Sequence, residues 1–567
     1  MTVIYKHTLY KRGHYVSHDS SPGTELMDLE VMKQSLTPFR SDIIQPMSER
    51  GRIARSATLI SVATFISRIL GFVRDMVIAG YLGATGLSDT FFVAFRIPNL
   101  LRELFAEGAM SSAFIPVLTE VGIKGGEEEA RRLSRVTFTF IITVVGVICV
   151  LGIIFAPSIV KLIAPGFTDK DKLSVTVLLT RIMFPFLLFV SLAAFTMGAL
   201  NVKRVFFVPA LASAWFNITV IITIVLLTVL FKHPVMAVAI GVTLGGMMQF
   251  ISQAPSYLRK GYSFGLDWHF RHEALRKMGR LLLPTILGLA VAQVNIFVST
   301  ILASYLREGS ITYLYYSMRL IQFPVGMFGV AMGMAVLPAL SEHASRGKID
   351  ALREDFSFAL RLLFFITVPA MAGLIALRMP IVNILFQRGE FDYRATEGTA
   401  FALMFYALGI WSMVGVRVVV SAFYSLQDTK TPVKVAVISM LTNIVLSIIL
   451  MGPLKHGGLA LSNSLASWLN FSLLFFFLRK RLGGVEGRRI TVTFLKVLTA
   501  SVLMGIFGYA LLHGKPWEEG GRQIMKGLYL GGTILACIVL YFGISLLTKT
   551  EEAKVITGIL RKKFSSR

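Results

Sequence analysis

Residues 56–80 read SATLISVATFISRILGFVRDMVIAG, an apolar run that is long enough to cross a membrane yet contains Arg68 and Arg74. A spanning helix needs about 20 mostly apolar residues. Three further arginines stand in comparable apolar surroundings: Arg96, Arg102 and Arg319. A cation at bilayer depth costs roughly 3 kcal/mol or more, so such residues usually face an interior cavity. Guanidinium groups suit phosphate recognition, and the run therefore predicts a membrane protein that handles an anion, with a diphosphate as the natural candidate.

The composition supports the membrane assignment. Of 567 residues, 54% are hydrophobic and only 16% are charged, whereas a soluble protein carries about 25% charged residues. We therefore expect an all-α membrane protein with fourteen transmembrane helices. Bent or broken helices are expected at Pro98 and Pro324. The predicted spans are 56–80, 88–119, 136–160, 173–200, 207–231, 234–257, 279–305, 311–340, 357–380, 396–425, 432–452, 457–478, 491–513 and 524–547.

The basic residues indicate an orientation. The net charge of +25 is concentrated in alternate short loops, such as Arg131–Arg135 and Arg479–Arg489. This is the positive-inside pattern, and it places both termini in the cytoplasm. We expect a multi-pass membrane protein and no nucleic-acid partner. Residues 1–50 are polar and aperiodic, which predicts a disordered N-terminal extension or a start assigned too early, with Met47 as a plausible start.

An internal repeat predicts the arrangement of the helices. Ile115–Glu120 recurs as Leu337–Glu342, an offset of 338 − 116 = 222 residues. The repeat unit contains six spans, so both copies enter the membrane in the same sense. We expect two parallel six-helix lobes around a central cavity, over residues 51–260 and 261–482. Residues 483–567 then add two C-terminal helices and a basic cytoplasmic tail.

The candidate site residues divide into cations and acids. A ligand role is predicted for Arg68, Arg74, Arg102 and Arg319, with ion pairing inside the membrane as the alternative for any one of them. Asp75, Asp89 and Glu107 are candidates for coupling to a cation or, more simply, for balancing nearby arginines. Asp428-Thr429-Lys430-Thr431-Pro432 resembles a phosphorylation motif without its glycine, and we interpret it as a loop that caps a helix.

Other chemistry finds no support in the sequence. There is no Walker A loop, no HExxH and no nucleophile elbow. The nine histidines show no ligand spacing, and the two cysteines lie within apolar runs. We therefore expect no cofactor, no metal ion and no enzymatic activity. The rival class is a membrane-embedded glycosyltransferase or lipid-phosphate enzyme, which would need a carboxylate or histidine cluster at a membrane face.

Several motifs occur in order at the spacing of a known family. They are Ser67–Asp75, Ser88–Arg102, Phe105–Ala109, Ala164–Phe167, Tyr315-Tyr316 before Arg319, and Asp428–Lys434. Through them the chain resembles the MurJ (MviN) family of lipid II flippases, of the multidrug, oligosaccharidyl-lipid and polysaccharide exporter superfamily. The likeness runs from about residue 51 to the end.

The resemblance implies a function and a set of residues. Members have fourteen helices, the last two forming a groove for a lipid tail. They carry lipid II, an undecaprenyl-diphosphate disaccharide pentapeptide, from the cytoplasmic to the periplasmic leaflet for cell-wall synthesis. Required cavity arginines map onto Arg68, Arg74, Arg102 and Arg319, and acidic positions of interest onto Asp75, Asp89 and Glu107. Expected partners are lipid II, membrane lipids and the cell-wall synthesis machinery.

The chain departs from the family pattern beside Arg319. Met318 stands where members often have an aspartate, and Gln322 where they often have a glutamate, so this wall is expected to be more positive. The alternative function within the superfamily is an ion-coupled multidrug exporter or an exporter of another polyprenyl-diphosphate oligosaccharide. An exporter of organic cations would favour an aromatic or acidic cavity, which the arginines argue against.

Overall fold

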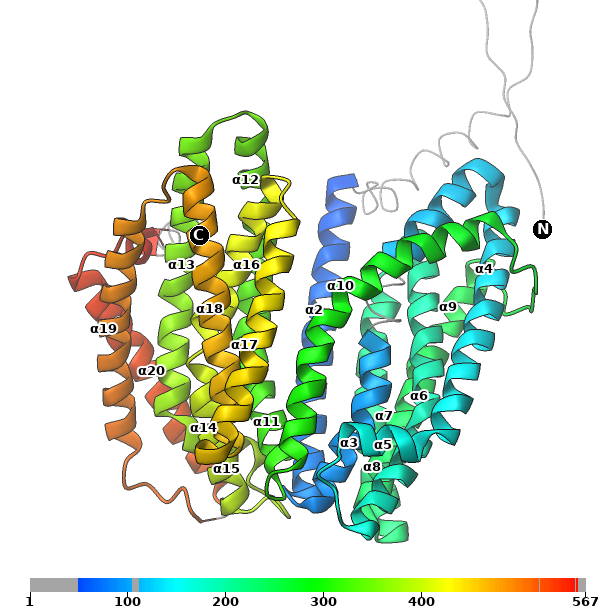
Figure 1. Cartoon of the computed structure of the whole chain (residues 1–567), viewed down its shortest axis with the longest axis horizontal. Coiled ribbons are helices and arrows are strands. Elements are labelled where there is room, and N and C mark those ends of the chain that lie inside the picture. The colour runs from blue at the N-terminus through cyan, green and yellow to red at the C-terminus, as the bar shows by residue number, and fades with distance from the viewer. Residues whose placement is uncertain (1–48, 104–111, 520, 556, 559–567) are drawn as a thin grey trace, which may run out of the picture. The chain divides into compact units, whose positions relative to one another are not determined.

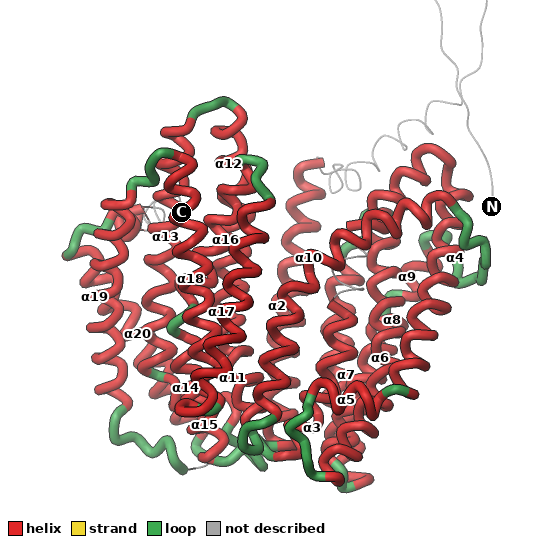
Figure 2. The backbone as a smooth tube through the Cα atoms, viewed as in Figure 1, coloured by secondary structure: helices red, strands yellow, loops and turns green. Residues whose placement is uncertain are grey.

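The computed structural model describes residues 49–103, 112–519, 521–555 and 557–558, and every regular element in this part of the chain is helical (Figure 2). Apolar helices satisfy all their backbone hydrogen bonds internally, as a lipid environment requires. The elements are α2 (Glu49–Leu82), α3 (Gly86–Arg102), α4 (Ile115–Ile154), α5 (Ala156–Ile163), α6 (Lys170–Val202), α7 (Phe207–Phe231), α8 (Pro234–Ile251), α9 (Ala254–Arg259), α10 (Glu273–Ser304), α11 (Ser310–Pro324), the π-helix η2 (Val325–Gly329), α12 (Val330–Ser345), α13 (Ile349–Ala376), α14 (Arg378–Phe386), α15 (Tyr393–Ala407), α16 (Ile410–Ser425), α17 (Lys430–Leu454), α18 (His456–Leu482), α19 (Gly487–Leu512) and α20 (Gln523–Leu547).

The chain forms two compact units, Met1–Leu59 and Ile60–Arg567. Of the extension predicted over residues 1–50, all but the last two residues lie outside the described part of the chain. Most of the predicted basic tail, residues 559–567, also lies outside it. The second unit contains the helices from Ile60 of α2 onward and holds everything that bears on function.

The predicted all-helical membrane fold is confirmed. Within the described residues, eleven helical stretches are long and apolar enough to cross a membrane. The three remaining predicted spans, 56–80, 88–119 and 279–305, correspond to α2, α3 and α10. Arg68, Arg74 and Asp75 make α2 less apolar than the other spans. Part of the predicted span 88–119 lies outside the described residues, since 104–111 are not among them.

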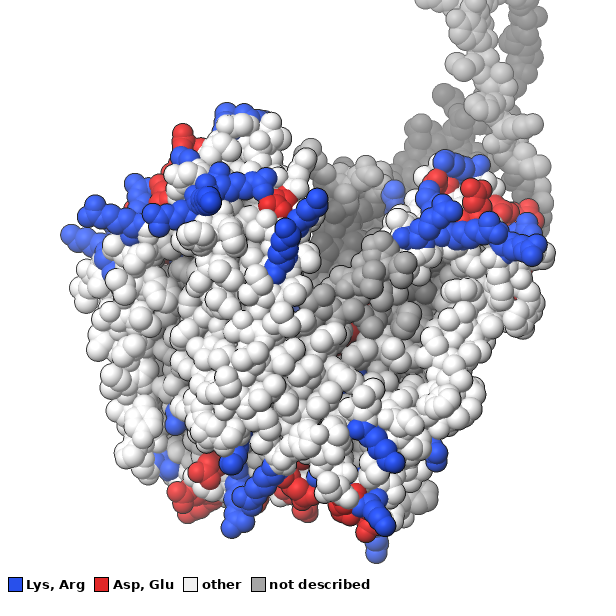
Figure 3. Space-filling model, in the orientation of Figure 1, with Lys and Arg blue, Asp and Glu red and all other residues white. Residues whose placement is uncertain are grey.

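The distribution of charged and apolar side chains on the surface is typical of a membrane protein. Lysine and arginine side chains gather along two opposite edges, and a broad band with few charges separates them (Figure 3). Large apolar side chains on α7 and α20 are exposed, among them Val229, Leu230, Leu535 and Val539. Lipid is a favourable surrounding for such side chains, whereas a soluble protein rarely exposes them in a continuous patch.

Helix contacts group most of the second unit into two sets of helices. Helices α3, α4, α6, α7 and α8 pack against one another, and α2 joins them through a hydrogen bond from Ser67 Oγ to the carbonyl of Ala210 at 3.3 Å. We call α2–α9 the N-lobe and α11–α18 the C-lobe. The two further helices lie at the outer side of the C-lobe, where α19 packs on α13 and α20 on α19 (Figure 1). Helix α10 contacts both lobes, through α4 and α17.

Proline acts differently at its two predicted break points. Helix α11 ends at Pro324, and a π-helical turn follows before α12 continues in the same direction. Proline has no backbone N–H to donate, so one helical hydrogen bond is missing here. A π-helical turn, which is wider than an α-helical one, accommodates this interruption. At Pro98 the helix is not broken, because α3 runs through this residue to Arg102. Pro98 lies twelve residues after the helix start, and its ring is buried against the N-lobe without ending the helix.

Candidate functional site

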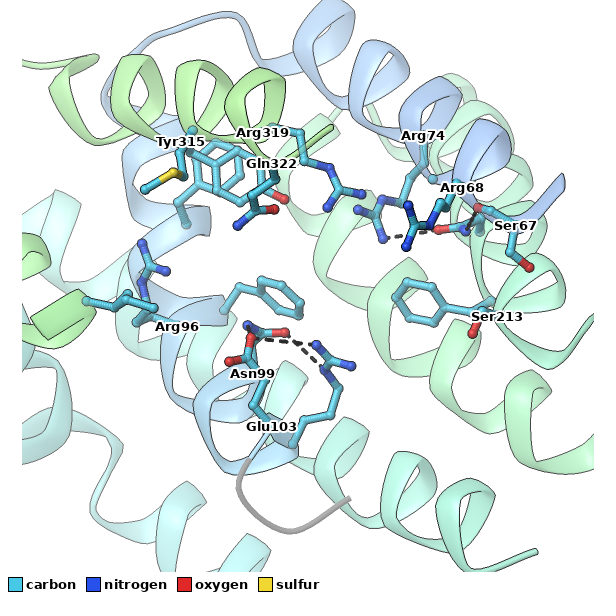
Figure 4. A pocket seen from close by; sticks show the side chains of 18 of the residues that line it. Ser67, Arg68, Arg74, Arg96, Asn99, Glu103, Ser213, Tyr315, Arg319 and Gln322 are labelled. Atoms are coloured by element: carbon cyan, nitrogen blue, oxygen red, sulfur yellow. Dashed lines mark hydrogen bonds and ion pairs between the residues drawn. The ribbon is translucent and has the colours of Figure 1, made fainter. Parts of the chain in front are cut away.

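A cavity of about 850 Å³ lies inside the second unit, and its wall includes residues of both lobes and of α10. Helices α2, α3, α7 and α11 contribute most of its polar side chains (Figure 4). All four arginines predicted as ligands line it: Arg68, Arg74, Arg102 and Arg319. Arg96, which the sequence analysis singled out as an intramembrane cation but not as a ligand, lines it too.

Asp75 holds arginines from both lobes. Its Oδ1 accepts hydrogen bonds from Arg74 Nη2 at 2.6 Å and Nε at 3.1 Å, and its Oδ2 accepts one from Arg319 Nε at 2.8 Å. The carboxylate is only 1% exposed, while the Arg319 side chain remains 35% exposed. The predicted ion-pair alternative is therefore realised for these two arginines, yet both still face the cavity. Asp75 serves as the charge partner that lets them approach each other.

Two glycines make room for this cluster. Gly71 lies on α2 between Arg68 and Arg74, and a Cβ atom there would lie 3.4 Å from Arg319 Nη2. Gly326 of η2 faces Arg68, whose Nη1 would lie 3.9 Å from a Cβ at that position. Arg68 forms no hydrogen bond or ion pair with any residue that the structure describes. The group of Arg68, Arg74, Arg319 and Asp75, which we call the arginine cluster, therefore carries two positive charges in excess.

Asn217 of α7 orients Arg74 and was not predicted. Its Oδ1 accepts a hydrogen bond from Arg74 Nη1 at 3.1 Å, and its Nδ2 donates to the carbonyl of Ser67 at 3.1 Å. Phe216 packs its ring 5.5 Å from the Arg74 guanidinium, close enough for a cation–π attraction. The available signal was an asparagine inside the apolar run Trp215–Val220, which in a membrane helix needs a partner.

Arg102 belongs to a second group at the end of α3. Its Nε donates to Asn99 Oδ1 at 3.1 Å, and its Nη2 lies 3.7 Å from Glu103 Oε1. Glu103 also accepts hydrogen bonds from Asn99 Nδ2, at 3.1 Å, and from Gln293 of α10. Arg102 is thus matched by a carboxylate of its own, and the pair carries no excess charge.

Asp89 lies away from the cavity wall and closes one end of the molecule. The carboxylate is 2% exposed and accepts hydrogen bonds from the backbone N–H of Gly309 at 2.7 Å and of Thr312 at 3.0 Å, and from Thr312 Oγ1 at 2.8 Å. It therefore caps the first turn of α11, where backbone donors otherwise lack partners. Its hydrogen-bond partners are therefore backbone and hydroxyl groups of the C-lobe. Glu107, the third predicted acid, lies outside the described residues.

Further contacts join the lobes at the same end. The N–H of Glu390 donates to the carbonyl of Gly80 at 2.9 Å, and Ser88 Oγ lies 2.8 Å from Thr312 Oγ1. Gly83 adopts a positive φ of 61°, and a Cβ there would lie 2.4 Å from the Glu390 carbonyl oxygen. Only glycine permits so close an approach. These contacts hold the two lobes together at the end where α3 meets α11.

The wall beside Arg319 is uncharged at positions 318 and 322. Met318 and Gln322 both line the cavity, together with Tyr315 and Tyr406. The ring of Tyr315 stacks on Phe92 with centroids 4.1 Å apart, which joins α11 to α3. Cavity-lining residues therefore include five arginines but, beyond Glu103, no carboxylate among the described residues.

The chain is similar to known proteins over most of its length. A family model described as "Lipid II flippase MurJ" matches residues 78–520. A protein of Vibrio cholerae named "Probable lipid II flippase MurJ" is 34% identical over 518 residues, covering 89% of this chain and 98% of that protein. A solved structure titled "Lipid II flippase MurJ, inward closed conformation" superposes with a TM-score of 0.72 at 29% identity, over 87% of this chain and 98% of that one.

A more distant likeness concerns the fold alone. The inward-facing structure of a multidrug resistance MATE family transporter of the MOP superfamily superposes with a TM-score of 0.63. The identity is 13%, and the match covers 75% of this chain and 98% of that one.

Proposed function

Because the chain belongs to the family of the lipid II flippase MurJ, we propose that it moves lipid II from the cytoplasmic to the periplasmic leaflet of a bacterial inner membrane, for cell-wall synthesis. One observation carries the proposal: Arg74 of the N-lobe and Arg319 of the C-lobe share one carboxylate at the wall of a common cavity. A ligand with two acidic groups placed there would contact both lobes at once.

The charge of the arginine cluster suits a diphosphate. Three guanidinium groups and Asp75 leave an excess of two positive charges, and a diphosphate joined to carbon at both ends carries two negative ones. Guanidinium groups bind phosphate oxygens through paired, charge-assisted hydrogen bonds. Arg68 has no described partner to give up, whereas Arg74 and Arg319 would exchange part of their contact with Asp75 for contact with the phosphates. We propose Arg68, Arg74, Arg102 and Arg319 as the head-group site.

The lobes would carry the cargo by alternating access. In this conformation the contacts of Asp89, Gly80 and Ser88 close the end where α3 meets α11. The loops at that end hold few basic residues, and we assign it to the periplasm. Both termini are then cytoplasmic. Release of the head group requires these contacts to break while the opposite end closes. No covalent bond of the cargo is made or broken in this cycle, so the protein acts as a transporter rather than an enzyme.

The lipid tail would stay outside the cavity. The pair α19 and α20 lies on the outer side of α13 with large apolar side chains exposed, including Ile506, Leu535 and Val539. We propose that residues 483–567 form this lipid-tail groove and a basic tail. Residues 51–260 and 261–482 are then the two lobes. Membrane lipids and the cell-wall synthesis machinery are the further partners that we propose. Asp75, Asp89 and Glu107 remain the candidates for coupling to an ion.

Translocation by the purified protein tests the proposal. The full chain is reconstituted in liposomes with fluorescent lipid II, and the fraction that reaches the outer leaflet is measured over time. Wild type should move the lipid and Arg319→Ala should not, because the cluster loses its C-lobe member. Arg181→Ala is the matched control: this arginine also lies in a spanning helix, but its Nε donates to the Ile153 carbonyl at 3.2 Å, away from the cavity. Equal translocation by wild type and Arg319→Ala would contradict the proposed site.

The alternative cargo within the superfamily is an organic cation. The distant likeness to a multidrug transporter concerns only the fold, and five arginines in the cavity wall repel a cation. Efflux of a cationic dye from the same liposomes, without translocation of lipid II, would favour this alternative.

A further inference from the structure

We infer that Arg96 recognises a second anionic group of the cargo, a carboxylate at the end of its peptide. The inference rests on the proposed function and deepens it, because it assigns a separate subsite of the same cavity to the peptide. Three observations lead to it: the position of Arg96, its lack of partners, and the distribution of charge around the cavity.

Arg96 lies apart from the arginine cluster. It projects from α3 into the cavity on the side opposite Arg68, Arg74 and Arg319, with Tyr315 and Gln322 between them (Figure 4). An anion held at the arginine cluster would therefore leave Arg96 to a different part of the same ligand. A cargo with two anionic groups joined by sugars has this form.

Arg96 has no partner in the part of the chain that the structure describes. None of its nitrogens takes part in a hydrogen bond or ion pair there, and its Nε is buried without an acceptor. Arg74, Arg102 and Arg319, by contrast, each have a carboxylate within 4 Å. A buried guanidinium donor without an acceptor is costly, and within a membrane such residues are retained where they contact a ligand.

The distribution of charge favours a group with one negative charge. The arginine cluster has two positive charges in excess, which a diphosphate neutralises, and Arg102 is matched by Glu103. Among the lining residues that the structure describes, one positive charge then remains, at Arg96. The neighbouring lining residues Met318, Gln322 and Tyr406 carry no charge that could neutralise it.

A carboxylate meets these requirements best. A guanidinium and a carboxylate form two parallel hydrogen bonds in one plane, and any peptide with a free end carries this group. A sugar hydroxyl would use the donors but leave the charge unmatched. Arg96 would thus distinguish a head group that carries a peptide acid from one that lacks it.

The test compares three lipids in the reconstituted full chain: lipid II with free peptide carboxyl groups, the same lipid with these groups amidated, and undecaprenyl diphosphate without sugar or peptide. The dissociation constant of each is measured for wild type, Arg96→Gln and Arg96→Lys. Wild type should bind the free acid about tenfold more tightly than the amide, as one charged hydrogen-bonding contact predicts. Arg96→Gln should abolish this preference, and Arg96→Lys should retain part of it.

The third lipid separates the possible failures. Undecaprenyl diphosphate should bind wild type and Arg96→Gln equally, which also shows that the variant is folded. If Arg96→Gln keeps the preference for the free acid, or if wild type has none, the inference is wrong. If Arg96→Gln weakens all three lipids alike, Arg96 serves the diphosphate or the fold, and the inference is again wrong. Failure of wild type to bind lipid II in either form would overturn the proposed function itself.

Discussion

Arg319 Nε donates a hydrogen bond to Asp75 Oδ2 at 2.8 Å and so joins α11 of the C-lobe to α2 of the N-lobe at the wall of the cavity. The other carboxylate oxygen is occupied by Arg74. A single buried acid therefore sets the spacing of two arginines that come from different halves of the chain. Any ligand that draws these arginines toward itself also acts on the contact between the lobes.

Replacing the Asp75 carboxylate by an amide of nearly the same size should lower both stability and translocation. Asp75→Asn leaves Arg74 and Arg319 near each other without their shared counter-charge, and we expect a loss of about 1–3 kcal/mol of stability together with loss of translocation. The measurement is the thermal unfolding midpoint in detergent. In a double-mutant cycle, Arg319→Gln should cost less in the Asp75→Asn background than in wild type. Strictly additive effects would show that the two side chains do not interact.

The volume of the side chain at position 71 should determine whether Arg319 can keep its place in the arginine cluster. A Cβ at Gly71 would lie 3.4 Å from both Arg319 Nη2 and Asn217 Nδ2, so Gly71→Ala fits with small shifts. Gly71→Leu should displace Arg319 and weaken binding of undecaprenyl diphosphate at least tenfold, while Gly71→Ala should change it less than about threefold. Equal binding by both variants would show that the arginine does not need this position.

The contacts of Asp89 should control access from the end where α3 meets α11. Asp89→Asn weakens the cap on α11, while Thr312→Val removes one of its three hydrogen bonds at nearly constant volume. The measurement is labelling of a cysteine at the cavity-lining position Ser299 by a membrane-impermeant maleimide, with Cys149 and Cys537 replaced by alanine. Labelling from the periplasmic side should increase in the order wild type, Thr312→Val, Asp89→Asn. Unchanged labelling in Asp89→Asn would contradict the gating role.

The loop before α17 should lose stability only in strong acid. Hydrogen bonds from the backbone N–H of Thr431 are the main reason why the pKa of Asp428 lies below its ordinary value of 3.8; burial opposes the shift, and the Thr431 hydroxyl, Arg481 and the Lys430 N–H add to it. A lowered pKa contributes stability above the ordinary value, and this contribution is lost as the pH falls through the lowered one. Asp428→Ala should therefore be less stable than wild type by about 1 kcal/mol at pH 7. The two proteins should converge below pH 4 in thermal unfolding, and a constant difference down to pH 2 would contradict this assignment.

Candidate site residues could be recognised from the sequence where a charged residue stands inside an apolar run. Arg68, Arg74 and Arg319 stand out in apolar runs because a membrane helix rarely carries cations. The cap at Asp428 was also predicted, and its bonds to Lys430 and Thr431 confirm it. These features depend on local sequence alone.

Other features depend on how distant segments meet. Asn217 becomes part of the site only because α7 packs beside α2, about 150 residues away in sequence. Arg96 differs from Arg102 in having no carboxylate beside it, which spacing along α3 does not reveal. Asp89 likewise has its partners Gly309 and Thr312 in the other half of the chain, which its own stretch of sequence does not reveal.

The most direct test of the diphosphate site is a cryo-electron microscopy structure of the full chain with lipid II bound. We predict that the phosphate oxygens lie within hydrogen-bond distance, about 3 Å, of the guanidinium nitrogens of Arg68, Arg74 and Arg319. Diphosphate density outside the cavity, with Arg74 and Arg319 still bound to Asp75 as they are here, would contradict the proposed site.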